Sequence, residues 1–300
     1  MGKYDRNAGL DPQSQFTEIY RNLATYEFPW DLNQSLSFAL FRTYAVPSIG
    51  HLLDTTGAFT TDTQKRYDDT GILLEVPLLH GFDSRQGKAA VRRINQMHKM
   101  YDISDDDMRY VLATFVVVPK RWIDDFGWRR LTPAEIVGSV NYYRTLGRHM
   151  GIKDIPETYD EFAVLMDDYE RANFAYDAGA RRVADSTMDL LASFYPKPLK
   201  PLIDEFSRSL MDDALLKAFR YERPSRVARR LSIMGLRLRA QVVRRLPART
   251  KPQHVYEMSR IRSYPNGFEI ERMGTFAPGC PVRHVGDDVS AEALPAEKIS

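Results

Sequence analysis

Helix-start signals recur along this chain of 300 residues, and they limit its fold more than any other feature. A Ser or Thr ahead of an amphipathic stretch, with an acidic residue three positions later, satisfies the N–H groups of a first helical turn. The chain repeats this pattern at Ser104 with Asp107, Thr132 with Glu135, and Thr158 with Glu161, and Ser225 opens a long basic segment. Gly151, just after Arg148 and His149, is typical of a helix end. Strand signals show no such series, and we therefore expect an all-α protein.

Residues 110–119, YVLATFVVVP, are the place where β-branched residues crowd together and a buried strand competes with a helix. The cap at Ser104 favours the helix. Pro119 predicts that this helix kinks or ends there, because proline removes a donor and clashes with the preceding turn. Pro47 is interpreted in the same way. Kinked buried helices often wall a pocket, and core packing explains both stretches equally well.

The composition is that of a globular enzyme rather than a nucleic-acid-binding protein. Hydrophobic residues make up 43% of the chain, enough for a core in one large domain, which we favour over two smaller ones. A formal net charge of +2, without a basic stripe interleaved with aromatic residues, predicts no nucleic-acid partner. The single cysteine, Cys280, excludes an intrachain disulfide and fits a reducing compartment.

The first residues, MGKYDRNAGL, lack the apolar core of a signal peptide. No window reaches the roughly 18 uninterrupted apolar residues of a membrane-spanning helix. Arg6 stands where a myristoylation motif requires Ser or Thr, so we do not expect Gly2 to carry a lipid. The expected localisation is cytoplasmic.

Arg66, Thr70 and His98 are the strongest chemical signal in the chain. Arg66 and Thr70 lie four residues apart, so a helix presents both side chains on one face. Val91, Ile94 and His98 follow at helical intervals and place the imidazole on an apolar stripe. A buried neutral imidazole can bind iron, copper or zinc, although a core histidine more often hydrogen-bonds a carbonyl. The residues alone leave both interpretations open.

Several other metal and catalytic centres lack their motifs. The chain contains no Glu-x-x-His pair for a di-iron bundle, no His-Glu-x-x-His, and too few cysteines for structural zinc. The hydrolase elbow, the P-loop and the dinucleotide-binding glycine motif are missing as well. Cys280 in FAPGCP is a candidate thiolate ligand, but an incidental thiol is the commoner case. It is not in a covalent haem-attachment motif.

Five stretches resemble the superfamily of MpaB-type oxygenases and latex-clearing proteins (rubber oxygenases): FRTYAVPSIGHLLDTTGAF, QKRYDDT, RRINQMH, DDDMRYVLATFVVVPKRWIDDFGWR and YYRTLGRHMGIKDIPETYDEF. The similarity spans roughly residues 35–250. GWRRLTPAE and the stretch from YYR to IPETY indicate the MpaB-like branch. The resemblance implies a single globin-like multi-helix domain over residues 1–250 that holds haem b. The Pro- and Gly-rich residues 251–300 predict an extended C-terminal wrap and a frayed tail.

The resemblance also implies roles for the three candidate residues. His98 would be the axial ligand of the haem iron, Arg66 would contact a propionate or bound oxygen, and Thr70 would donate a hydrogen bond nearby. The implied reaction uses dioxygen to cleave a carbon–carbon double bond of an apolar small molecule, such as an isoprenoid or a lipid, into two carbonyl products. The alternatives are a non-catalytic haem protein that binds a gas or a lipid, and a metal-free helical interaction protein.

Asp69 departs from the resembled rubber oxygenases, which carry a distal lysine one position before the threonine. In the closed state of those enzymes this lysine is a neutral amine ligand. An aspartate cannot take that role, so we do not expect the same closed state here. They also use a distal carboxylate as a base, and Asp54 is the one acid that residues 40–60 offer for this role.

Residues 224–246 carry seven arginines among leucines, valines and isoleucines. One interpretation is a basic amphipathic helix in peripheral contact with an anionic membrane surface. The other, which we favour from the sequence, packs the apolar stripe on the core and leaves the arginines to solvent, acidic runs or haem propionates.

Overall fold

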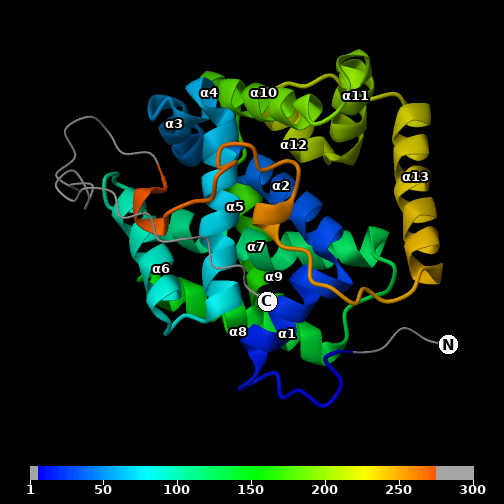
Figure 1. Ribbon diagram of the computed structural model, residues 1–300. Helices are drawn as coiled ribbons and strands as arrows, with labels where there is room; N and C mark the ends of the chain where they lie inside the picture. The colour runs from blue at the N-terminus through cyan, green and yellow to red at the C-terminus, as the bar shows by residue number, and fades with distance from the viewer. Residues whose placement is uncertain (1–5, 275–300) are drawn as a thin grey trace. The chain divides into compact units, whose positions relative to one another are not determined.

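The computed structural model describes residues 6–274, and every regular element within them is a helix (Figure 1). The predicted all-α fold class is confirmed. Contacts group the described residues into a larger unit, residues 6–63 and 103–254, and a smaller unit, residues 64–102 and 255–274. Cys280, with its candidate role as a thiolate ligand, and the predicted frayed tail lie outside the described residues. The boundary at residue 250 stays a prediction.

The larger unit is built around one long buried helix, α7 (Asp105–Phe126). This helix packs against α2, α8 and α9. Aromatic side chains fill its contact with α2, where Trp122 stacks on Phe38 at 5.6 Å between ring centroids. The remaining elements of this unit are α1 (Phe16–Asn22), the π-helical η1 (Leu23–Glu27), α2 (Pro29–Tyr44), α3 (Pro47–Thr55), α4 (Ala58–Thr61), α8 (Pro133–His149), α9 (Tyr159–Asn173), α10 (Ala178–Ser193), η2 (Lys197–Leu199), α11 (Lys200–Leu210), α12 (Asp213–Phe219) and α13 (Arg226–Arg245).

The helix starts that the sequence predicts are confirmed at the level of hydrogen bonds. Ser104 caps α7 by accepting from the Asp107 N–H, and Ser225 caps α13. Thr132 and Thr158 each form a complete capping box, at the starts of α8 and α9. Local chemistry therefore specifies where these helices begin.

The end of α8 also follows its sequence signal. Gly151 has a φ of +77°, and the N–H of Ile152 reaches back to the carbonyl of Gly147 at 3.0 Å. This is the glycine-terminated Schellman arrangement, which satisfies the last carbonyls of a helix.

The two prolines of the buried stretches occupy different positions in their helices. The helix α7 continues through Pro119 to Phe126, so of the two outcomes expected there, a kink or an end, the end is wrong. Burial of Val117 and Ile123 on either side holds this turn in helical geometry despite the missing donor. Pro47 occupies the first turn of α3, where the missing N–H has no helical partner to lose.

The smaller unit consists of α5 (Thr63–His80), α6 (Arg85–His98), η3 (Val255–Glu257) and η4 (Ile270–Arg272), with irregular chain between the last two. Three buried carboxylates of α5, those of Asp68, Asp69 and Glu75, bind residues 255–274. Asp68 accepts from the N–H groups of Arg262 (3.0 Å) and Ser263 (2.9 Å). Glu75 accepts from Val255 (2.8 Å). The acids thereby fasten residues 255–274 along α5.

The structure of α13 contradicts the interpretation of residues 224–246 that we favoured from the sequence, in which the apolar stripe packs on the core. Only Leu236 and Ala240 of α13 are buried, Ile233 and Val243 are half-buried, and its other large apolar side chains face outward. The packing contact with the core is therefore made by a few small or central residues, not by the whole apolar stripe. Within residues 6–274, none of the helices combines the length and the apolar character that crossing a bilayer requires.

Asp68→Asn should destabilise the protein by about 2–4 kcal/mol. Both backbone donors share Oδ2, so an amide that keeps its oxygen there turns its NH2 group toward the donor Nε2 of Gln64, and the buried bonds also lose the carboxylate charge. Urea unfolding of the two proteins measures this difference. Asp83→Asn is the matched control, since the Asp83 side chain is 97% exposed and its pair with Lys88 is long, at 4.0 Å. Equal losses in the two variants would show that Asp68 does not anchor residues 262–263.

Candidate functional site

Arg66 and Thr70 meet on α5 in the arrangement that their spacing predicts. The guanidinium Nη1 of Arg66 donates to Thr70 Oγ1 at 2.6 Å. The hydroxyl of Thr70 donates in turn to the carbonyl of Arg66 at 2.8 Å, as helical Ser and Thr residues often do. The hydroxyl hydrogen is thus committed to the helix backbone. Thr70 can therefore orient the guanidinium, but it has no further hydrogen to donate.

His98 is the last residue of α6, on the side of the helix that buries Val91 and Ile94. Its Nδ1 is inaccessible to solvent and has no hydrogen-bond partner among the described residues. Burial, together with the nearby positive charge of Arg66, lowers the pKa of His98 to about 4. The imidazole is therefore neutral at physiological pH and keeps an available lone pair.

The structure thus brings all three predicted residues into one unit, although they come from two helices. Arg66 and Thr70 are joined by a hydrogen bond, and Arg66 and His98 are close enough to interact electrostatically. The alternative was an ordinary core histidine that hydrogen-bonds a carbonyl, and Nδ1 of His98 makes no such bond among the described residues. A neutral, inaccessible and unpartnered imidazole nitrogen beside a cation is suited to binding a metal or a ligand group.

Asp69 is a buried acid that holds the C-terminal segment on α5. Its fully buried carboxylate accepts from Lys65 Nζ at 2.6 Å, from the Gly274 N–H at 3.1 Å and from the hydroxyl of Tyr264. These bonds fasten residues 264–274 to α5. The position that holds a lysine in the resembled rubber oxygenases is used here to attach the C-terminal segment.

Asp54, the candidate base, belongs to the larger unit and is engaged by an arginine. Arg182 donates to both of its carboxylate oxygens, at 3.1 Å and 2.5 Å. These hydrogen bonds lower the pKa of Asp54 below its ordinary value. A carboxylate in this state is a weaker base than an unpaired one.

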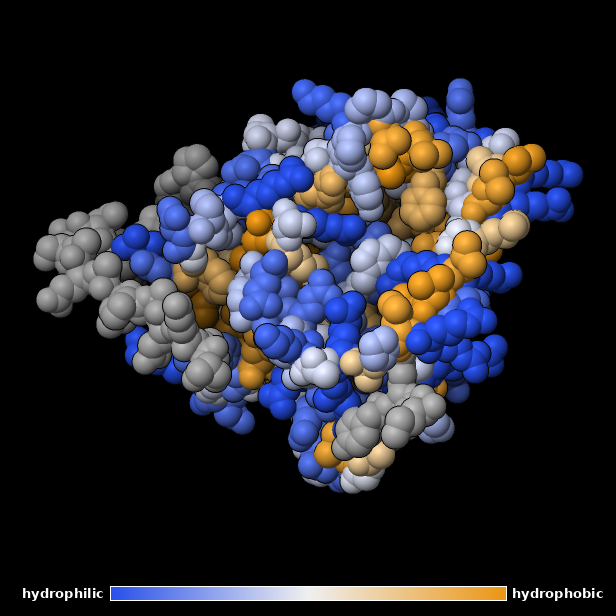
Figure 2. Space-filling model, turned by 45° about the vertical axis from the view of Figure 1, so that its right-hand side comes forward, coloured by the Kyte–Doolittle hydropathy of each residue, from blue (hydrophilic) through white to orange (hydrophobic). Residues whose placement is uncertain are grey.

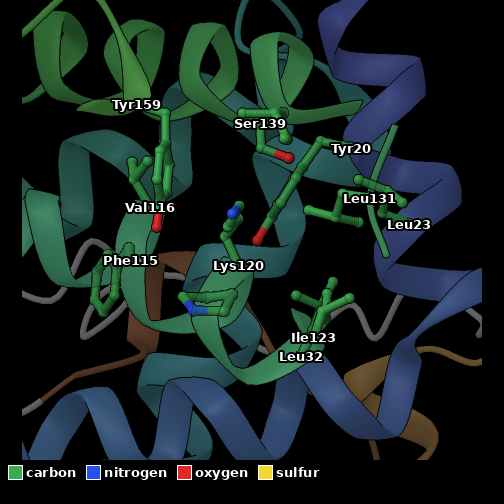
Figure 3. A pocket seen from close by; sticks show the side chains of 12 residues that line it. Tyr20, Leu23, Leu32, Phe115, Val116, Lys120, Ile123, Leu131, Ser139 and Tyr159 are labelled. Carbon is green, nitrogen blue, oxygen red and sulfur yellow. The ribbon is translucent and has the colours of Figure 1, made fainter. Parts of the chain in front are cut away.

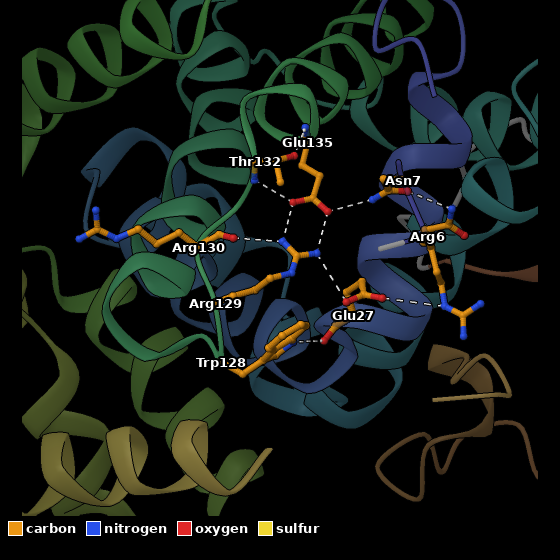
Figure 4. Close-up of polar contacts among 9 residues, drawn as sticks. Arg6, Asn7, Glu27, Trp128, Arg129, Arg130, Thr132 and Glu135 are labelled. Atoms are coloured by element: carbon orange, nitrogen blue, oxygen red, sulfur yellow. Dashed lines mark hydrogen bonds and ion pairs between the residues drawn. The ribbon is translucent and has the colours of Figure 1, made fainter. Parts of the chain in front are cut away.

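The motif GWRRLTPAE forms a buried charge cluster in the larger unit (Figure 4). Arg129 makes a two-pronged bond to Glu135, at 2.7 Å and 2.8 Å, and reaches Glu27 at 3.5 Å. Glu135 is fully buried and also accepts from the Thr132 N–H and from Asn7. Burial opposes its ionisation, but the bonds from Arg129 and Thr132 outweigh burial and lower the pKa of Glu135.

This cluster joins three parts of the larger unit: the start of α8, η1 and the residues ahead of α1. The sequence shows the capping box but not the burial of Glu135 or its pairing with Arg129. The sequence signal that could have predicted this pair is an arginine, Arg129, six residues before the capping-box Glu135. The motif that marks the family therefore has a structural role in the larger unit.

A narrow pocket lies between α7, α8 and η1 in the larger unit (Figure 3). The space between its lining atoms is about 340 Å³, including the part that opens to solvent. Phe115, Val116 and Pro119 of α7 contribute to its wall, so this buried helix does line a pocket. Lys120 also lines it and is paired with Asp124 at 2.6 Å. None of the three predicted site residues lines this pocket.

A metal centre made only of protein ligands is not found in the part of the chain that the structure describes. No group of three or more His, Cys, Asp or Glu side chains in residues 6–274 is arranged to hold an ion. His98 is therefore a single candidate ligand rather than a member of a ligand cluster.

Comparison with known proteins agrees with the fold and with the motifs. Residues 34–245 match the family described as ER-bound oxygenase mpaB/B'/Rubber oxygenase, catalytic domain. The match covers more than two thirds of the chain and places it in a class of all-helical oxygenase domains. The chain belongs to the mpaB/B' and rubber oxygenase catalytic-domain family.

Three relatives from Penicillium species are similar to this chain in sequence. The ER-bound oxygenase mpaB' of Penicillium brevicompactum is 35% identical over 225 residues, which are 69% of this chain and 53% of the relative. The ER-bound oxygenase mpaB of Penicillium roqueforti (strain FM164) is 32% identical over 68% of this chain and 74% of the relative. The mpaB of Penicillium brevicompactum is 33% identical over 70% of this chain and 58% of the relative. The predicted MpaB-like branch is confirmed, and the chain spans about half the length of the first of these relatives.

The lowered pKa of His98 predicts a pH-dependent stability of the cofactor-free protein. Between about pH 6.5 and about pH 4 the unfolded chain binds a proton that folded His98 does not, so stability falls as pH falls through this window. The loss from this group reaches up to about 3 kcal/mol. Urea unfolding at neutral pH and at the acid end of the window, for wild type and His98→Gln, measures it. An unchanged pH dependence in the variant would refute the assignment.

Proposed function

We propose that this chain is a b-type haem-dependent oxygenase that cleaves a carbon–carbon double bond of an apolar small molecule, isoprenoid or lipid-like. The observation that carries the proposal is the neutral imidazole of His98 beside Arg66, whose Nδ1 is inaccessible and has no hydrogen-bond partner among the described residues. Membership of an oxygenase family supports the use of dioxygen. The predicted cytoplasmic localisation is part of the same proposal.

The residues present fit a haem group. Haem iron needs only one protein side chain on its proximal side, unlike a metal bound by the protein alone. His98 offers one ligand, and residues 6–274 offer no protein-only cluster that would compete for the iron. A neutral imidazole requires no deprotonation before it binds iron. When bound, haem supplies the activation of dioxygen.

Arg66 and Thr70 have different roles in this proposal. Arg66 carries the positive charge, which suits a propionate or a polarised oxygen atom. Thr70 acts as a positioning residue, because its oxygen accepts from Arg66 while its hydrogen is used by the backbone. The shared hydrogen bond fixes one guanidinium nitrogen on the same helical face as the hydroxyl.

The proposed reaction is balanced without an external reductant. The double bond breaks, each of its two carbons gains one oxygen atom of the same dioxygen molecule, and two carbonyl products form. The side chains of the chain have to bind an apolar substrate, hold the cofactor and exclude water. The apolar substrate class comes from the family, and a purified protein offered isoprenoid and unsaturated lipid candidates would identify it.

The absorption spectrum of the purified full chain tests the cofactor. We expect a Soret band after expression with haem supply, and we expect His98→Ala to lose most of the bound haem. His80→Ala is the matched control, because His80 lies in the same unit at the exposed end of α5. Added imidazole should restore the band to His98→Gly. A wild type without a Soret band, or a His98→Ala spectrum equal to that of wild type, would overturn the proposal.

Thr70→Val tests the positioning role, because valine keeps the shape and removes the bond to Arg66. We expect the Soret band to persist and the rate of carbonyl product formation to fall about tenfold, equivalent to about 1.4 kcal/mol. Thr70→Ser should recover most of the rate, since it restores the hydroxyl. If Thr70→Val instead abolishes haem binding, Thr70 is required for the cofactor site itself.

A further inference from the structure

The helix α13 exposes a continuous apolar stripe. Six large apolar side chains on α13 and at its end are 51–67% exposed: Val227, Leu231, Met234, Leu238, Val242 and Leu246. Their spacings of three and four residues place them on one face of the helix. Figure 2 shows an orange band with blue residues beside it at the edge of the molecule where α13 lies. Exposure of this many large apolar residues in one row marks a surface that binds a partner.

The opposite face of α13 fixes the helix to the larger unit. Leu236 and Ala240 are buried, and the helix packs against α11 and α7. Arg239 pairs with Asp31 at 3.0 Å and stacks over the ring of Trp30 at 3.7 Å. These contacts determine which side of α13 faces outward. The stripe is therefore presented by a docked helix rather than by a loosely attached one.

A row of arginines runs along one flank of the stripe. Arg226, Arg230, Arg237 and Arg244 are exposed and lie four, seven and seven residues apart, which places them on the same side of the helix. None of the four makes an ion pair within residues 6–274. Residues 226–246 contain no Asp or Glu. The surface thus combines an apolar band with a positive edge that is not paired with acids of residues 6–274.

We propose that this face of α13 binds the surface of a bilayer that contains anionic lipids. The apolar stripe would enter the boundary between headgroups and acyl chains, and the arginine row would lie among the lipid phosphates and carboxylates. A helix of 20 residues extends for about 30 Å, so the whole row can contact the membrane at once. This inference goes beyond the oxygenase function and does not depend on haem.

Charge favours a lipid surface over a second copy of the chain. In a two-fold symmetric dimer through this stripe, each arginine row would approach the same positive helix of the other copy, because an isologous interface pairs like surfaces. Like charges at that distance oppose association. An anionic headgroup layer instead complements the row along its whole length.

Sedimentation of the full chain with lipid vesicles tests the proposal. We expect binding to phosphatidylcholine vesicles that contain phosphatidylserine, little binding to phosphatidylcholine alone, and weakening by added salt. The double variant Arg230→Gln/Arg237→Gln should bind about 30-fold more weakly, since each cation near the surface contributes about a factor of five. Leu231→Ser/Leu238→Ser should also lose binding. Circular dichroism checks that these exposed substitutions leave the helices intact.

Matched substitutions elsewhere in the larger unit provide the controls. Arg130→Gln/Arg148→Gln removes the same charge from exposed positions, and Val164→Ser removes an apolar side chain that is 61% exposed. Both should bind like wild type. Equal binding by the α13 and control variants would overturn the proposal, as would equal binding to vesicles without anionic lipid. A concentration-dependent dimer that Leu231→Ser/Leu238→Ser abolishes, without vesicle binding, would assign the stripe to a second copy.

Discussion

The buried carboxylates of α5 are the constraint on which the smaller unit depends. Asp68, Asp69 and Glu75 are inaccessible or nearly so, and a carboxylate in such a place is tolerated only when its oxygens accept hydrogen bonds. Residues 255–274 supply those bonds through backbone N–H groups and the Tyr264 hydroxyl. Residues 255–274 therefore supply the hydrogen-bond donors that the buried carboxylates of α5 need, and the carboxylates hold these residues on the helix. The same helix carries Arg66 and Thr70.

This arrangement links the structural and the chemical residues of α5. Asp69 and Thr70 are neighbours in sequence, yet one faces the C-terminal segment and the other bonds Arg66. Successive residues of a helix point about 100° apart, so adjacent positions serve different surroundings. The aspartate that departs from the rubber oxygenases thus anchors the chain, while Arg66 and Thr70 bond each other on another side of the helix.

Much of the local structure was predictable from short-range chemistry. Caps at Ser104, Thr132 and Thr158 gave the helix starts, because their side chains bond donors only three residues away. The sequence predicted a kink or an end at Pro119, and the end is wrong because packing on the neighbouring helices outweighs the loss of one donor. The outward stripe of α13 was missed for a related reason. An amphipathic pattern defines two faces, but it does not say which face meets the core.

The site divides in the same way between sequence and structure. Sequence determined the all-α class, the joint placement of Arg66 and Thr70, the family and its MpaB-like branch, because these depend on local spacing and on runs of residues that resemble members of the family. Only the tertiary structure decided that His98 Nδ1 has no partner, that Thr70 has committed its hydrogen, and that Asp69 and Glu135 are buried structural acids. Burial and hydrogen-bond partners come from residues that are distant in the chain, and no local pattern records them.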